Sequence, residues 1–236
     1  MLLPGVNEFR VLDRLFFDVL QKNISPDAIA WLTVKADLVR NEEKSTQLNL
    51  AFSHLPKQTG KAAVEITPAE TLEISALLPG FSIEGWSADR LARVWLLMQV
   101  RETDKELYLK KISGLFDASE MNEQVALYSA LPFYTNPENW IARCETGIRS
   151  NIGTVLESIM YYNPYPAAYL SENSWNQLVL KAFFTEKDVT KITGLENRVN
   201  TALIDTLNDY VAERTAAHRT VEPNIYKLIE LRNQTI

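Results

Sequence analysis

The sequence is poor in the residues that build metal, disulfide and nucleophilic sites. It has one cysteine, Cys144, and two histidines, His54 and His218. A single cysteine cannot form a disulfide within the chain, and a zinc site needs several Cys or His ligands. Phosphate-binding P-loop, nucleophile-elbow and His-Glu-x-x-His patterns do not occur in the sequence. We therefore expect no metal, no cofactor and no recognisable catalytic motif, and we interpret Cys144 as a buried apolar residue.

Basic residues are also in deficit, with 24 Lys and Arg against 30 Asp and Glu, a net charge of −6. Proteins that bind nucleic acid need a surplus of cations to displace counterions, so we expect no nucleic-acid partner. The longest apolar run, 94–98, is far shorter than the roughly 18 residues of a transmembrane helix. Residues 1–5 lack the basic start of a signal peptide. We expect a cytoplasmic protein with no transmembrane segment.

Glycine is scarce, at eight residues, and alternating apolar and polar residues are rare, which disfavours a β fold. Only the short segment 62–66 resembles a strand. Helical apolar spacing recurs from end to end. We predict an all-α fold of about ten antiparallel helices stacked as hairpins, for which a short irregular α-solenoid of the HEAT-like type is one arrangement. We expect one domain over residues 1–236, with a soft subdivision near 132–137.

Several polar residues are placed to begin helices. They are Ser25, Thr67, Thr103, Ser174 and Asn200. Thr67, Thr103 and Ser174 are each followed three residues later by Glu or Gln, the pattern of a capping box. Pro137 and the regular apolar spacing from Ile141 to Ile159 predict one long helix, which the Asn-Pro-Tyr-Pro turn at 163–166 ends.

The segment 142–184 contains the candidate binding residues. The helix around Lys181 is apolar on both flanks and is therefore predicted to be buried, where a lysine needs a counter-charge or a route to water. We hypothesise that Arg149 and Lys181 converge on an anionic group, because Arg binds phosphate or carboxylate in a bidentate manner and Lys adds a point charge. The residues expected to orient this ligand by hydrogen bonds are Asn151, Asn163, Tyr165 and Asn176.

The same charged residues also fit a purely structural interpretation. Arg149 can pair with Glu145 one turn earlier on its helix, and Lys181 can reach Glu157. Likewise, Trp86 and Trp140 either line a groove or fix the path of the chain into a helix as hydrophobic staples.

Short motifs throughout the chain resemble the EboA-domain family. They are Leu50-Ala51-Phe52-Ser53 with Pro56, Gly60-Lys61, Gly85-Trp86-Ser87, the stretch 127–132, Gly147-Ile148-Arg149-Ser150-Asn151, Asn163-Pro164-Tyr165-Pro166 and the stretch 175–182. The last three are the most specific in combination. They fall within the segment that contains Arg149 and Lys181.

The resemblance implies a role beside other enzymes rather than a known reaction. Genes of this family accompany a bacterial operon whose other products look like a UbiA-type prenyltransferase, a TatD-like hydrolase, a dehydroquinate-synthase-like cyclase, a sugar-isomerase-like barrel and a phosphodiesterase-like enzyme. This set of neighbouring genes implies a role in secondary metabolism, in which a prenylated cyclitol-like product is made or exported.

Three hypotheses about function follow. The first is a non-catalytic accessory protein that holds an anionic small molecule or docks a pathway enzyme. The second is an enzyme that acts on a phosphorylated small molecule and uses Glu157 as acid–base, with Arg149 and Lys181 stabilising charge. The third is a helical scaffold that binds another protein.

Overall fold

The computed structural model describes residues 3–101 and 104–233. In these ranges the chain forms thirteen α-helices, four short 3-10 turns and no strand, which confirms the all-α prediction. The α-helices are α1 Val6–Asn23, α2 Pro26–Asn41, α3 Thr46–Thr59, α4 Pro68–Leu77, α5 Ala88–Met98, α6 Lys105–Ala118, α7 Met121–Ser129, α8 Ile141–Arg149, α9 Gly153–Met160, α10 Tyr165–Tyr169, α11 Glu172–Phe184, α12 Thr201–Ala216 and α13 Pro223–Asn233. The 3-10 turns are η1 Leu131–Phe133, η2 Pro137–Trp140, η3 Val189–Lys191 and η4 Glu196–Arg198.

Most of the predicted helix starts are confirmed. The Ser25 hydroxyl accepts a hydrogen bond from the Ala28 amide, and Thr67 forms a complete capping box with its glutamate. Asn200 caps α12. The start predicted at Ser174 is wrong, because Ser171 caps α11 and the helix begins three residues earlier than Trp175. Thr103 lies outside the described residues.

The long helix predicted from Pro137 to Ile159 is also wrong, because the chain leaves the helical conformation at Ser150. The Ser150 hydroxyl accepts a hydrogen bond from the Ile152 amide at 3.1 Å, and such local bonds compete with helical ones. The break lets α8 and α9 fold back on each other. Gly147 leaves no room there for a side chain, since a Cβ would meet the Ile159 side chain and come within 2.7 Å of the Tyr128 ring.

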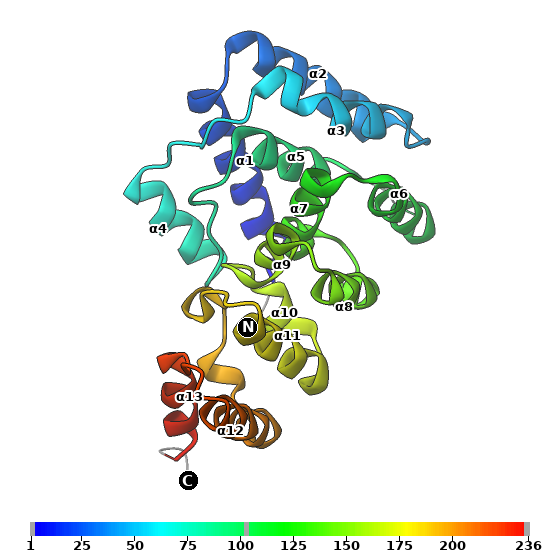
Figure 1. The fold of residues 1–236 in the computed structure, drawn as a ribbon. Coiled ribbons are helices and arrows are strands. Elements are labelled where there is room, and N and C mark those ends of the chain that lie inside the picture. Colours follow the sequence, from blue (N-terminus) through cyan, green and yellow to red (C-terminus); the bar gives the residue numbers. More distant parts are fainter. Residues whose placement is uncertain (1–2, 102–103, 234–236) are drawn as a thin grey trace.

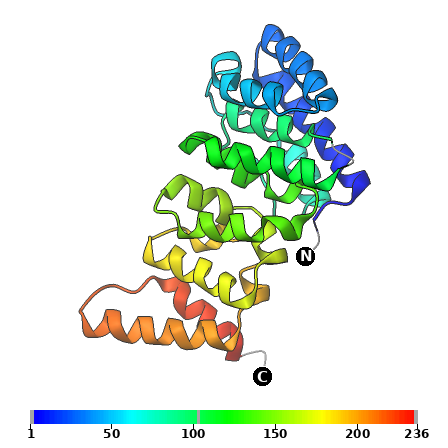
Figure 2. The same cartoon turned by 90° about the vertical axis from the view of Figure 1, so that its right-hand side faces the viewer.

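The helices form a layered stack along one long axis. Figures 1 and 2 show α2 and α3 at one end and α12 and α13 at the other, with the layers between them in chain order. Each helix of the series α2, α3, α5, α7 and α9 packs on the next, and α8, α11 and α12 continue the stack. The chain thus shows the predicted stacked arrangement of helices.

Helix α5 lies at the centre of the part of the stack that α1, α2, α3 and α7 form. It packs against α1, α3 and α7. Each of its residues except Arg90 is buried, including the charged Asp89 and Arg93. Because charged groups are rarely buried without a partner, the charged residues of α5 are candidates for a functional site.

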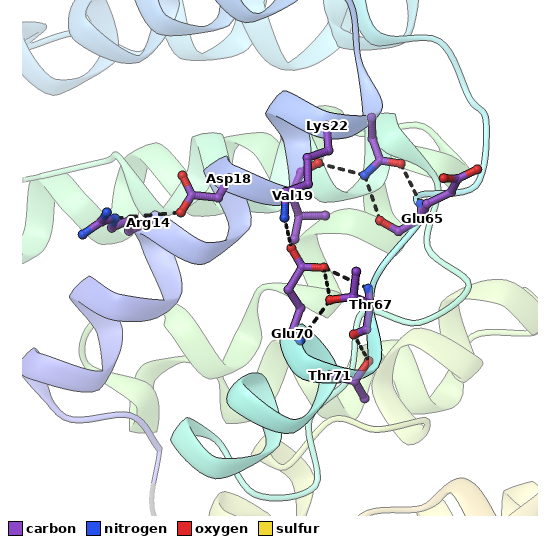
Figure 3. A network of polar contacts seen from close by, with 9 residues as sticks. Arg14, Asp18, Val19, Lys22, Glu65, Thr67, Glu70 and Thr71 are labelled. Atoms are coloured by element: carbon purple, nitrogen blue, oxygen red, sulfur yellow. Dashed lines mark hydrogen bonds and ion pairs between the residues drawn. The ribbon is translucent and has the colours of Figure 1, made fainter.

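Helix α4 is attached to α1 by a polar network (Figure 3). The Lys22 ammonium donates to the Glu70 carboxylate at 2.5 Å, and the amide and hydroxyl of Thr67 donate to the same carboxylate. The hydrogen bond from Lys22, followed by those from Thr67, lowers the pKa of Glu70 to about 2. The network therefore stabilises the fold while Glu70 is ionised.

Two isolated β-bridges join loops that are distant in sequence. Ala63 pairs with Ser87, in place of the strand expected at 62–66, and Tyr161 pairs with Ile192. The Val64 amide donates to the Trp86 carbonyl at 2.8 Å, and the Tyr162 amide donates to the Lys191 carbonyl at 2.9 Å. Among the described residues, no helix combines the length and apolar character needed to cross a membrane.

Candidate functional site

A cavity of about 420 Å³ lies between α5, α7 and α9, and we call it the Arg90 cavity. The first β-bridge places Lys61 beside the turn 84–87 at its rim, and the second places Lys191 beside Tyr161. The lining residues are Lys61, Glu84, Gly85, Trp86, Ser87, Asp89, Arg90, Asn122, Val125, Thr154, Glu157, Tyr161, Tyr162 and Lys191. The volume falls in the range of small-molecule sites.

The Arg90 guanidinium is held on two sides. Gly85, in the left-handed region at a φ of 75°, turns the chain so that Trp86 enters the core. The Arg90 Cζ lies 4.1 Å from the centre of the Trp86 ring, which is a cation–π contact. Its Nε donates to the Ser129 hydroxyl at 3.0 Å. The group is thus fixed in place before any ligand arrives.

The outer nitrogens of Arg90 are free to bind. In the described part of the chain, Arg90 forms no ion pair, and its hydrogen bond is the one to Ser129. Among those residues, Trp175 Nε1 is the fully buried side-chain polar atom that lacks a hydrogen-bond partner. The outer nitrogens of Arg90 also lack a partner but are not fully buried, so a molecule in the cavity can reach them. Burial lowers the pKa of Arg90 to about 9, against the opposing fields of Glu157 and Asp89. It is therefore a cation at neutral pH with unused donors.

The nearby carboxylates are already compensated. Asp89 accepts from the Ser87 hydroxyl at 2.6 Å and from Arg93 at 2.7 Å. Glu157 pairs with Lys187 at 2.6 Å. The lining contains three acidic and three basic residues; Arg93 and Lys187 offset Asp89 and Glu157 from outside the lining, and Asp188 offsets Lys191, which leaves Arg90 and Lys61 against Glu84. The cavity therefore favours a ligand with negative charge near Arg90.

The remaining lining groups suit a polar molecule. Thr154 and Tyr162 carry hydroxyls and Asn122 carries an amide. Tyr162 adopts a left-handed φ of 51°, which is uncommon for a bulky residue and is held by its bond to Lys191. A guanidinium with two free amino groups binds carboxylate or phosphate oxygens in a bidentate manner. The arrangement can hold an anionic group and orient a hydroxylated body.

Three of the sequence-predicted residues are engaged with the protein itself. The Asn163 amide donates to the carbonyls of Tyr128 and Ser158, and the Tyr165 hydroxyl donates to the Pro137 carbonyl at 2.6 Å. Asn176 and Asn200 exchange two hydrogen bonds. All three predicted side chains are buried, and none lines the Arg90 cavity. Their role in ligand binding stays a prediction.

The structure brings Lys181 to Asn151, with 3.3 Å between Nζ and the amide oxygen. Arg149 is exposed and donates to Thr146 on its own helix. Neither cation lines the Arg90 cavity, so their predicted convergence stays a prediction. Glu157 is the predicted site residue that does line the cavity, and the lysine that reaches it is Lys187.

Sequence reasoning missed Arg90. The signal was present, because Arg90 and Arg93 interrupt an apolar helix just as Lys181 does. Trp86 lines the cavity, which favours the groove interpretation for this residue, whereas Trp140 is buried and donates to the Thr135 carbonyl. Cys144 is buried as predicted, and burial raises the pKa of its thiol. Within 3–101 and 104–233, no three His, Cys, Asp or Glu side chains group as metal ligands would.

Comparison with known proteins gives one match. The family described as metabolite traffic protein EboA matches residues 12–230, from α1 to α13 and across the whole Arg90 cavity. No curated protein and no solved structure matches the chain. The description fits an accessory role in a metabolite pathway. The chain belongs to the EboA family of metabolite traffic proteins.

Proposed function

We propose that the protein is a non-catalytic accessory protein that holds a polar, anionic metabolite in the Arg90 cavity. A phosphate or carboxylate group of the metabolite accepts from the Arg90 outer nitrogens, with Lys61 adding charge at the rim. The hydroxyls and amide of Thr154, Tyr162 and Asn122 bind the polar body. The description of the family as a traffic protein agrees with holding a molecule rather than converting it.

The observation that carries the proposal is a largely buried cation that forms no ion pair with the described residues, although the fields of Glu157 and Asp89 act on it. Burying an ion costs several kcal/mol unless a partner compensates it. Ser129 and Trp86 position the Arg90 guanidinium but carry no negative charge. An anionic ligand supplies the ion-pair partner.

The test is titration calorimetry with inorganic pyrophosphate and glycerol 3-phosphate as probes and neutral glycerol as the blank. We expect both anions to bind and glycerol not to bind. Arg90→Gln should weaken binding about 10- to 100-fold, because hydrogen bonds to charged groups contribute about 1.5–3 kcal/mol each. Arg90→Lys should recover part of the loss, since it restores the charge without the planar fork.

Arg149→Gln and Lys181→Gln are the matched control variants, because each also removes one cation and neither residue lines the Arg90 cavity. We expect both to bind the probes like the wild type. If they abolish binding while Arg90→Gln does not, the site lies at the sequence-predicted residues and the Arg90 proposal is wrong.

The enzymatic hypothesis assigns acid–base chemistry to Glu157, which lines the same cavity. Its carboxylate is paired with Lys187, and the two cations proposed to assist it do not line the cavity. We therefore assign Glu157 to the shape and charge of the cavity wall. Release of phosphate from glycerol 3-phosphate that is lost in Glu157→Gln would contradict this assignment.

A further inference from the structure

A second cavity, of about 590 Å³, lies where the start of α1 meets η1, η2 and α10. Its lining residues are Leu3, Pro4, Gly5, Val6, Phe9, Arg10, Asp13, Arg101, Pro132, Phe133, Tyr134, Thr135, Pro137 and Tyr169. It shares no lining residue with the Arg90 cavity. We call it the Phe9 cavity.

The wall of the Phe9 cavity is mainly apolar and aromatic. The Phe9 and Phe133 rings meet edge to face, with 6.4 Å between their centres, and Tyr169 stacks on a buried neighbour at 5.1 Å. These rings are therefore held in place. Val6 adds apolar surface and is 70% exposed. Binding a molecule with an apolar body would remove this surface from water.

The charge at the rim is positive. Arg10 and Arg101 are exposed and line the cavity, and neither forms an ion pair in the part of the chain that the structure describes. The carboxylate in the lining is that of Asp13, which accepts from the buried Gln99 amide at 2.6 Å. Gln99 in turn accepts from Arg40. Asp13 therefore accepts a hydrogen bond from Gln99 and forms no ion pair with Arg10 or Arg101. The guanidinium groups of these two arginines can bind a ligand.

We propose that the Phe9 cavity binds a small amphipathic anion, with its apolar body against Phe9, Phe133 and Tyr169 and its carboxylate or phosphate head at Arg10 and Arg101. Most small-molecule sites combine a mostly apolar wall with a few placed polar groups, as this one does. The inference concerns a separate site and does not rest on the function proposed for the Arg90 cavity.

The test is titration calorimetry with hexanoate, octanoate and decanoate, each below its micelle concentration. We expect affinity to rise about fourfold for each added methylene, as burial of that group predicts. Decyl phosphate distinguishes the two head groups, because a site built for phosphate would prefer it to decanoate. Decanol should bind at least tenfold more weakly than decanoate, since it lacks the charge.

Val6→Asp is the sharpest variant, because it places a negative charge at the cavity without emptying the core. An acidic residue is favourable in the first turn of a helix, so the fold should be retained. We expect binding of decanoate to fall at least tenfold in Val6→Asp and in the double variant Arg10→Ala/Arg101→Ala. Val34→Asp is the matched control, since Val34 is 58% exposed on α2 and does not line the cavity.

Arg90→Gln should bind decanoate like the wild type, which separates this inference from the proposed function. The inference is overturned if decanoate does not bind, if decanol binds equally well, or if Val6→Asp and the double arginine variant both keep the wild-type affinity.

Discussion

Arg90 and Arg93 lie one turn apart on α5, yet their surroundings differ. Arg93 is 3% exposed and pairs with Asp89 at 2.7 Å and with Glu123 at 3.7 Å, while its Nε donates to the Phe52 carbonyl. Arg90 lies over the Trp86 ring and donates one hydrogen bond, to the Ser129 hydroxyl. Both guanidiniums lose water, and for both burial lowers the pKa.

The difference separates a charge that the protein pairs from one that it leaves unpaired. The protein supplies Arg93 with carboxylates from its own helix and from α7, so its donors are used. It holds Arg90 in position but gives it no ion pair within the described residues, and Glu157 and Asp89 act on it through their fields alone. We therefore expect the two residues to respond differently to substitution.

The largest effect is expected for Arg93→Met, which leaves Asp89 and Glu123 without their cation. Breaking a buried pair from one side costs about 3–5 kcal/mol of unfolding free energy. Urea unfolding measures the loss. Arg90→Met should cost less than about 1 kcal/mol in the same assay, because no carboxylate is abandoned. Equal losses in the two variants would contradict the contrast.

Glu70→Gln tests a third compensated charge, at the edge of the stack. Because the pKa of Glu70 is lowered from 4.5 to about 2, its ionised form stabilises the fold above pH 4.5. We expect a loss of about 1–2 kcal/mol at pH 7, since the Lys22 end of the pair is open to solvent. The difference from wild type should shrink as the pH falls from 4.5 towards 2. Urea unfolding at several pH values measures this, and a difference independent of pH would refute it.

Ser129→Ala sharpens the account of Arg90. It removes the hydrogen bond to Nε and leaves the charge, so the guanidinium is less well positioned. A hydrogen bond of this kind contributes about 0.5–1.5 kcal/mol, so we expect pyrophosphate to bind roughly three- to tenfold more weakly. Calorimetry measures the affinity. Unchanged binding would show that Trp86 alone positions the group.

The smallest effects are expected at the cations that the sequence first indicated. Arg149 bonds within its own helix and Lys181 bonds a neutral amide. Each substitution by Gln should change the unfolding free energy by less than about 0.5 kcal/mol. Thermal unfolding provides the measurement. A loss above 1 kcal/mol at Lys181 would mean that this lysine is a structural charge like Arg93.

The sequence sufficed for the fold class because helix signals are local. Thr67 and Glu70 form a capping-box pattern that predicts a helix start from four residues alone, and the structure confirms this start. The break at Ser150 was not predictable from spacing, because apolar residues keep their helical period across it. The hydrogen bond of the Ser150 hydroxyl and the packing of α9 on α8 accompany the break, and the apolar spacing reveals neither.

The Arg90 cavity was hidden for a similar reason. The spacing of apolar residues shows that an arginine lies on an apolar helix. It does not show whether a carboxylate forms an ion pair with that arginine. The Asp89 beside Arg90 in sequence pairs instead with Arg93, one turn further on. Glu157 was noted from sequence, yet its partner Lys187 and its nearness to Arg90 depend on the packing of α9.

The two β-bridges have a consequence for how binding ability arises. They fix Lys61 and Lys191 at one opening, so residues from the first third and the last quarter of the chain must meet before the rim is complete. Bringing together segments so distant in the sequence is slow compared with forming single helices. Capture of an anion by Arg90 should therefore appear late in refolding, and a chain that ended before residue 191 would lack one side of the opening. Binding of an anion at Arg90 would therefore indicate that the whole stack of helices has formed.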